Sequence, residues 1–82
     1  MSKKCPCCGF YTLNEEDSLY DICPVCFWEN DPSQEKYIGE LGANNVSLTE
    51  GRDNYRRFGA CEIRFLANTR APRLEEFGEQ DG

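Results

Sequence analysis

The six cysteines of this 82-residue chain are the residues best suited to chemistry. Four of them form two Cys-x-x-Cys pairs, which we call knuckles: Cys5/Cys8 in Cys-Pro-Cys-Cys-Gly and Cys23/Cys26 in Cys-Pro-Val-Cys-Phe. Two intervening residues let both sulfurs of a knuckle reach one metal ion, and fourteen residues separate the knuckles, close to the spacing of a four-cysteine zinc site. We therefore predict one structural zinc ion bound by Cys5, Cys8, Cys23 and Cys26. Tetrahedral sulfur ligation also suits iron, which stays open as a substitute.

Two cysteines, Cys7 and Cys61, are left over. Cys7 lies between two predicted ligands, so its side chain should point away from the metal. Cys61 lies among apolar residues, where cysteine usually behaves as a small hydrophobe. Two alternatives stay open: Cys7 could replace an oxidised ligand, or Cys7 and Cys61 could serve together as a thiol or metal sensor. A thioredoxin-like catalyst would need a βαβ context that this chain does not show.

Catalysis is not expected. The chain has no histidine, which removes the commonest general base and the usual ligand of catalytic zinc. Four thiolates would also leave no open coordination position at which the metal could activate water. We predict a protein that is not an enzyme, without catalytic residues and without an organic cofactor.

The charge of the chain favours some partners over others. Its formal net charge is −6; four thiolates would add −4 and one Zn²⁺ would add +2, which gives −8. Such a charge repels nucleic-acid phosphates and favours a basic protein partner. Arg52, Arg56 and Arg57 nevertheless form a basic strip. Pairing with local acids is its simpler role, and a nucleic-acid-binding zinc ribbon is the alternative. The sequence leaves the oligomeric state open.

The N-terminal residues and the hydropathy point to the cytoplasm. Residues 1–20 lack the apolar run of a signal peptide. No stretch of the chain approaches the roughly 18 consecutive apolar residues of a membrane-spanning helix. We therefore expect a cytoplasmic protein, where paired cysteines bind metal more often than they form disulfides.

The elements that must position the knuckles suggest a small, metal-stabilised α+β domain over residues 1–73. Residues 10–13 and 19–22 are short aromatic and β-branched runs on either side of the polar stretch 14–18. This pattern predicts a β-hairpin with a five-residue loop that leads from one knuckle to the other. Residues 5–31 would thus form a knuckle-and-hairpin unit, and residues 32–46 are predicted to be a loop.

A helix is predicted over residues 48–58. Ser47 and Glu50 fit a capping box, and Gly59 fits the position just past the end of a helix. Gly51 would allow the predicted hairpin to approach the helix closely. One face of the helix is apolar or small, with Leu48, Gly51, Tyr55 and Phe58.

The segments around this helix are less distinctive. Residues 60–67 alternate as a strand would but also show helical spacing, and we favour a short helix. Residues 74–82 are expected to be a frayed acidic tail. Trp28 follows the second knuckle and is expected to cover the metal site or the helix, although a partner-binding role is the alternative.

Several stretches resemble the bacterial cysteine-rich CPCC proteins: residues 5–9, 20–29, 42–48 and 58–61. The similarity spans roughly residues 5–73. It implies a zinc-ribbon-like or rubredoxin-like pair of knuckles, although Phe27 follows the second knuckle where rubredoxins have glycine. Members of this family are sometimes encountered near toxin–immunity loci, so the resemblance also implies an expected role as a toxin-neutralising immunity-type protein.

Overall fold

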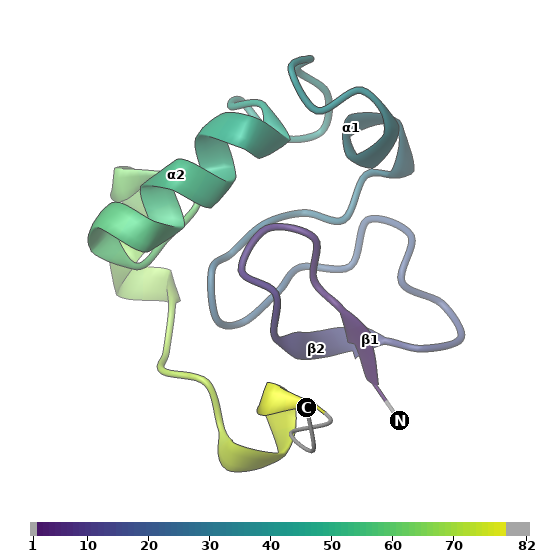
Figure 1. The fold of residues 1–82 in the computed structure, drawn as a ribbon, viewed down its shortest axis with the longest axis vertical. Helices are drawn as coiled ribbons and strands as arrows, with labels where there is room; N and C mark the ends of the chain where they lie inside the picture. Colours follow the sequence, from purple (N-terminus) through teal and green to yellow (C-terminus); the bar gives the residue numbers. More distant parts are fainter. Residues whose placement is uncertain (1, 79–82) are drawn as a thin grey trace.

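The computed structural model describes residues 2–78 and shows a small α+β fold, as predicted. Figure 1 shows a small hairpin near the middle of the molecule, with the helices on one side of it and the C-terminal segment on the other. None of the described helices is long and apolar enough to cross a membrane. The elements in chain order are β1 (Ser2–Lys4), β2 (Tyr11–Asn14), α1 (Pro32–Lys36), α2 (Leu48–Phe58) and two 3-10 helices, η1 (Ile63–Asn68) and η2 (Leu74–Phe77).

The predicted pairing of residues 10–13 with 19–22 is wrong. The antiparallel partner of β2 is β1, which precedes the first knuckle, with Ser2 opposite Asn14. The predicted strand 19–22 instead pairs at its last residue, Ile22, which forms an antiparallel bridge to Glu29 across the second knuckle. Each extended run thus pairs across its own knuckle, because the tight metal-binding turn brings the two flanking strands together.

Helix α2 has the predicted bounds. The Ser47 side chain accepts a hydrogen bond from the Glu50 backbone N–H at 3.1 Å, which caps the first turn. Gly59 ends the helix with φ at +94°, a left-handed conformation that suits glycine. Leu48 and Gly51 are buried on the inner face.

Gly51 allows a close approach, but to the knuckles and not to the predicted hairpin. A Cβ at this position would lie 3.1 Å from Cζ3 of Trp28 and 3.4 Å from Sγ of Cys7. Trp28 and Leu48 are both fully buried. The inner face of α2 therefore lies directly on the two knuckles, and the core forms at this contact.

The segment 32–46 is not a structureless loop as predicted. Asp31 caps the short helix α1, and its carboxylate also accepts a bond from the Ala43 N–H at 2.9 Å. The fully buried Gln34 donates to the carbonyls of Glu40 and Val46, both at 2.9 Å. Side-chain hydrogen bonds thus organise this segment where regular secondary structure is short.

The same polar network reaches the second knuckle through Asn44. The Asn44 side chain donates to Gln34 Oε1 at 2.8 Å. It also exchanges two bonds with the backbone of Glu29, at 2.8 and 2.9 Å. Segment 32–46 is therefore fastened to the strand that leaves the second knuckle.

The C-terminal part contains more structure than predicted. Residues 63–68 form the 3-10 helix η1, in agreement with the preference for a short helix over a strand. Residues 74–77, assigned to a frayed tail, form η2, because Glu76 is buried and paired with Arg70 at 2.7 Å. Residues 79–82 of the predicted tail lie outside the described residues.

Candidate metal centre

The two knuckles share one backbone hydrogen-bond pattern. In the first, the Cys5 N–H donates to the Phe10 carbonyl at 2.8 Å and the Gly9 N–H donates to the Cys5 carbonyl at 2.9 Å. In the second, the Cys23 N–H donates to the Trp28 carbonyl at 2.9 Å and the Phe27 N–H donates to the Cys23 carbonyl at 2.8 Å. The two turns therefore present their cysteine pairs in the same way.

These turns bring the four predicted ligands, Cys5, Cys8, Cys23 and Cys26, together. All four sulfurs lie within 4.8 Å of one another. The first cysteine of each knuckle lies 3.7 Å from the second cysteine of the other, in the pairs Cys5–Cys26 and Cys8–Cys23. A tetrahedral ion with Zn–S bonds of about 2.3 Å requires sulfur–sulfur distances of about 3.8 Å. The cluster therefore fits a single metal ion bound by four thiolates.

Cys23 is the best supported thiolate of the cluster. The Thr12 hydroxyl donates to Cys23 Sγ at 2.9 Å, and the Val25 N–H lies 3.4 Å from the same sulfur. A hydrogen bond from Cys26 and further donors lower the pKa of Cys23, whereas the bonds to Cys23 raise the pKa values of Cys8 and Cys26. Without a cation, neighbouring thiols share protons; a metal ion would replace those protons and let all four sulfurs ionise.

Sequence reasoning missed the role of Thr12. The register of the hairpin passes from Lys3 opposite Leu13 to Lys4 opposite Tyr11, so that Thr12 has no partner across the sheet. Such an irregularity re-aims a side chain, and here Thr12 bonds the cluster. The residue pattern indicates only that Thr12 lies in an extended run, and it contains no signal for the irregularity that turns the hydroxyl toward Cys23.

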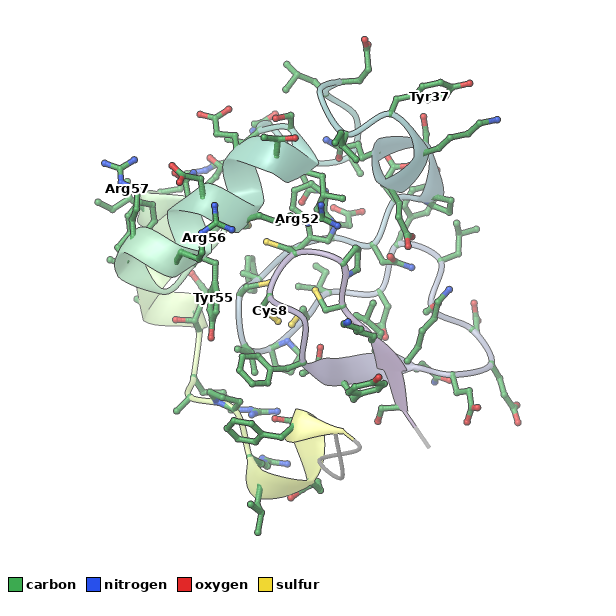
Figure 2. The ribbon with its side chains drawn as sticks, in the orientation of Figure 1. Cys8, Tyr37, Arg52, Tyr55, Arg56 and Arg57 are labelled. Carbon is green, nitrogen blue, oxygen red and sulfur yellow. The ribbon has the colours of Figure 1, made fainter. Side chains whose placement is uncertain are left out.

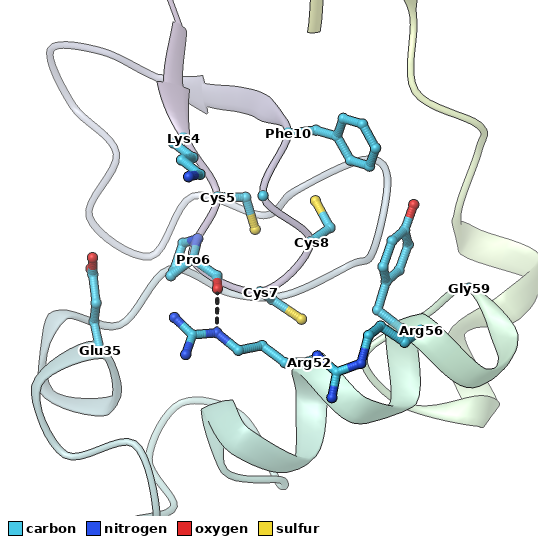
Figure 3. A pocket seen from close by; sticks show the side chains of 12 residues that line it. Lys4, Cys5, Pro6, Cys7, Cys8, Phe10, Glu35, Arg52, Arg56 and Gly59 are labelled. Carbon is cyan, nitrogen blue, oxygen red and sulfur yellow. Dashed lines mark hydrogen bonds between the residues drawn. The ribbon is translucent and has the colours of Figure 1, made fainter. Parts of the chain in front are cut away.

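A cavity of about 780 Å³ lies over the first knuckle (Figure 3). Cys8 is the one predicted ligand that is only half-buried, whereas the other three are fully buried. Tyr55 of α2 also lines the cavity, and burial raises the pKa of its hydroxyl to about 12. Arg52 crosses the cavity and donates from Nε to the Pro6 carbonyl at 2.8 Å. Solvent therefore reaches the cluster from the Cys8 side.

The two remaining cysteines are buried. Cys7 lies in the core against Gly51 of α2, and Cys61 is fully buried. Burial raises the pKa of Cys61 to about 12. The Cys61 N–H donates to the Cys26 carbonyl at 2.9 Å, so the chain after α2 is fastened to the second knuckle. Cys61 behaves as a core side chain, as predicted; Cys7, expected only to be a tolerated thiol that points away from the metal, lies in the core as well.

Trp28 packs beneath α2, and two of the three arginines pair with a local acid, as the simpler interpretation of each predicted. Trp28 is fully buried beneath α2, which excludes it as an exposed anchor for a partner. Arg56 and Arg57 both pair with Asp53, at 3.5 and 3.7 Å, on the outer face of α2, whereas Arg52 turns toward the first knuckle (Figure 2). Two of the three arginines thus share one acidic partner, and the third bonds a backbone carbonyl of the first knuckle.

Comparison with known proteins identifies one family. The family model described as cysteine-rich CPCC matches residues 3–76, which include both knuckles, α2 and η1. None of the curated proteins that were compared matches the chain.

Proposed function

We propose that this chain, which belongs to the cysteine-rich CPCC family, is a non-catalytic zinc-binding module that mediates protein–protein interaction. The observation that carries the proposal is the cluster of four cysteine sulfurs within 4.8 Å, three of them on fully buried residues. Four thiolates would complete the coordination of a tetrahedral ion and leave no position for water or substrate. The metal would then act as a structural cross-link between the two knuckles.

Zinc is proposed over iron because the loop between the knuckles is short and close to the spacing of a four-cysteine zinc site. Elemental analysis of the purified protein should give one zinc per chain; one iron per chain, with the absorption of an iron–thiolate centre, would overturn the choice of metal. A cytoplasmic location is part of the proposal, since reducing conditions keep the thiols available for the metal.

The proposed partner is a basic protein. The net charge of −6 would steer such a partner toward the chain more than it would raise the affinity. A toxin-neutralising immunity-type role is one form that this interaction could take, with a basic toxin domain as the partner.

A pull-down from the native host tests this function. The tagged, metal-loaded protein is incubated with lysate at low salt, and the retained proteins are identified and then purified. We expect a basic protein that is released as the salt is raised, and its toxicity in cells should fall when the two proteins are co-expressed. If no purified candidate binds in a reconstituted assay, the interaction role is wrong; if binding occurs without neutralisation, the immunity-type role alone is wrong.

A nucleic-acid-binding zinc ribbon is a weaker candidate. Arg56 and Arg57 are engaged with Asp53, and Arg52 is bonded to the first knuckle. A sensor built on Cys7 and Cys61 is weaker too, since Cys61 is fully buried and its burial raises the pKa of its thiol to about 12, which disfavours the reactive thiolate. Titration with DNA and RNA at low salt, and mass spectrometry after mild peroxide treatment, test these two alternatives respectively.

A further inference from the structure

One stretch of the chain combines acidic charge with exposed apolar side chains. No lysine or arginine occurs between Lys4 and Lys36. The same stretch carries seven acidic residues: Glu15, Glu16, Asp17, Asp21, Glu29, Asp31 and Glu35. Within it, Leu19, Tyr20 and Ile22 leave 58%, 53% and 44% of their surface exposed. Asp31 is buried and Glu35 lines the cavity over the first knuckle, which leaves five acids closer in sequence to these apolar residues. Exposed apolar side chains next to charge of one sign are typical of a binding surface.

The backbone holds these residues in place. Tyr20 has φ at +58°, in the left-handed region that non-glycine residues rarely adopt. Its N–H donates to the Asn30 carbonyl at 2.7 Å, and the buried Asn30 side chain donates to the Ser18 carbonyl at 2.8 Å. The Asp21 carboxylate accepts a bond from the Asn14 N–H at 2.9 Å. The segment is therefore ordered before any partner binds, which reduces the entropy lost on association.

A small hollow continues this surface beyond Ile22. Its volume is about 160 Å³, and Ile22, Phe27 and Phe65 contribute apolar walls. Two carboxylates, Glu29 and Glu62, and one guanidinium, Arg64, also line it, with Arg64 paired to Glu62 at 2.9 Å. The volume is enough for one apolar side chain of a partner.

We propose that Leu19, Tyr20 and Ile22, with the adjoining hollow, form the docking surface for a basic protein segment that carries apolar anchors. We call this the loop surface; Figure 1 shows the loop after β2 on the side of the molecule opposite α2. The inference rests on the proposed interaction role and names the surface that performs it. Charge complementarity selects a basic partner, and the exposed side chains supply the apolar contacts that hold it.

A random-peptide selection tests the loop surface before the native partner is identified. The metal-loaded protein is the target, and we expect enrichment of peptides that combine lysine or arginine with large apolar residues. The combined Leu19→Ser and Ile22→Ser variant should weaken binding of an enriched peptide at least about tenfold, because apolar anchors dominate such interfaces. Both residues are exposed, and metal content with circular dichroism checks that the variant folds.

Leu41 and Ile38 provide the matched control. They are exposed to a similar degree, 66% and 46%, but lie outside the loop surface. Their combined change to serine should leave peptide affinity within about twofold of the wild type, well below a tenfold effect. Enrichment of acidic peptides, a failure to enrich any, or an equal loss in both variants would overturn the proposal. If the native partner from the pull-down binds the Leu19/Ile22 variant normally, the loop surface is wrong while the interaction role stands.

Discussion

At the residue scale, Phe27 occupies in the second knuckle the position that Gly9 occupies in the first. Their φ angles are +67° and +85°, both left-handed. Glycine adopts this conformation readily, whereas phenylalanine does so at a cost of about 1–2 kcal/mol. The Phe27 ring packs on Phe65 with 4.7 Å between centroids. Phe27 thus joins the second knuckle to the chain that follows α2, which a glycine could not do.

The cluster predicts different outcomes for neighbouring cysteines. Cys23→Ser should abolish binding of one metal ion per chain, because it removes the sulfur that Thr12 and Val25 support. Cys7→Ala should retain one metal, since Cys7 is a core residue outside the four-sulfur cluster. Elemental analysis measures both. Equal metal loss in the two variants would mean that Cys7 is itself a ligand.

The Thr12 hydroxyl allows a test of a smaller contribution to metal affinity. Thr12→Val keeps the branched shape but removes the hydroxyl that donates to Cys23 at 2.9 Å. Outer-shell hydrogen bonds of this kind typically change metal affinity by about 10–100-fold, so we expect weaker metal retention toward the lower end of that range. Competition against a chromogenic chelator measures it. An unchanged affinity would show that the Thr12 hydroxyl has no role in metal binding.

At the scale of elements, the close contact between α2 and the knuckles limits what can stand at Gly51. Gly51→Ala would gain about 1 kcal/mol of helix propensity. The new Cβ would lie 3.1 Å from the fully buried Trp28 and 3.4 Å from Sγ of Cys7, so these side chains would have to shift. Overpacking costs about 1–3 kcal/mol, so we expect a net loss of stability. Thermal denaturation of the metal-loaded variant measures the change, and a raised midpoint would contradict it.

The C-terminal segment is held by a clamp at Arg70 and Glu76. The guanidinium makes two bonds to the carboxylate, at 2.8 and 2.7 Å, and the Arg73 N–H donates a third at 2.8 Å. The bond from Arg70 lowers the pKa of Glu76 below its ordinary value of 4.5. The stabilisation is therefore present above pH 4.5 and is lost as the pH falls through the lowered pKa.

Glu76→Gln should mimic, at neutral pH, the loss of the Glu76 charge that protonation causes at low pH. We expect faster amide hydrogen exchange in η2, with α2 unaffected, because the side-chain bonds of the clamp join residues within 70–76 and do not involve α2. Glu75→Gln is the control, since Glu75 is exposed on the same 3-10 helix. Faster exchange in both variants, or in neither, would argue against the clamp.

The sequence predicted α2 and the four-cysteine cluster because both depend on local patterns. Caps and apolar periodicity define the helix, and the Cys-x-x-Cys spacing defines each knuckle. Strand pairing could not be predicted in this way, since β1 at residues 2–4 shows no strand pattern of its own. For α1, Asp31-Pro32 indicates only the start of a helix that is too short to show periodicity. The ordered η2 depends on Arg70 meeting Glu76, a contact created by the fold.

At the scale of the whole molecule, the metal centre and the hydrophobic core are the same place. Among the described residues, the buried apolar set contains ten residues, and five of them are cysteines. The remaining members are Leu13, Val25, Trp28, Leu48 and Ala60. A core this small would be strongly stabilised by a bound metal, since structural zinc supplies about 10–16 kcal/mol of binding free energy in small domains.

Metal removal should therefore unfold the protein as a unit. A strong chelator at neutral pH is expected to abolish the helical circular dichroism signal of α2, even though α2 contains no ligand, because its inner face packs on the knuckles. Re-addition of zinc under reducing conditions should restore the signal. A metal-free protein that keeps its helical signal would show that the core is stable without the ion.

The half-buried position of Cys8 has a consequence for the rate of metal exchange, as distinct from affinity. Since Cys5, Cys23 and Cys26 are fully buried, the cavity at Cys8 is, within residues 2–78, the side from which an incoming ligand would reach a bound ion. Lys4, Arg52 and Arg56 line that cavity together with one acid, Glu35, so a negatively charged chelator should be drawn in more readily than a cationic one. Chelators of equal affinity would then strip the metal at unequal speeds. The lifetime of the bound ion would depend on the charge of the molecule that removes it.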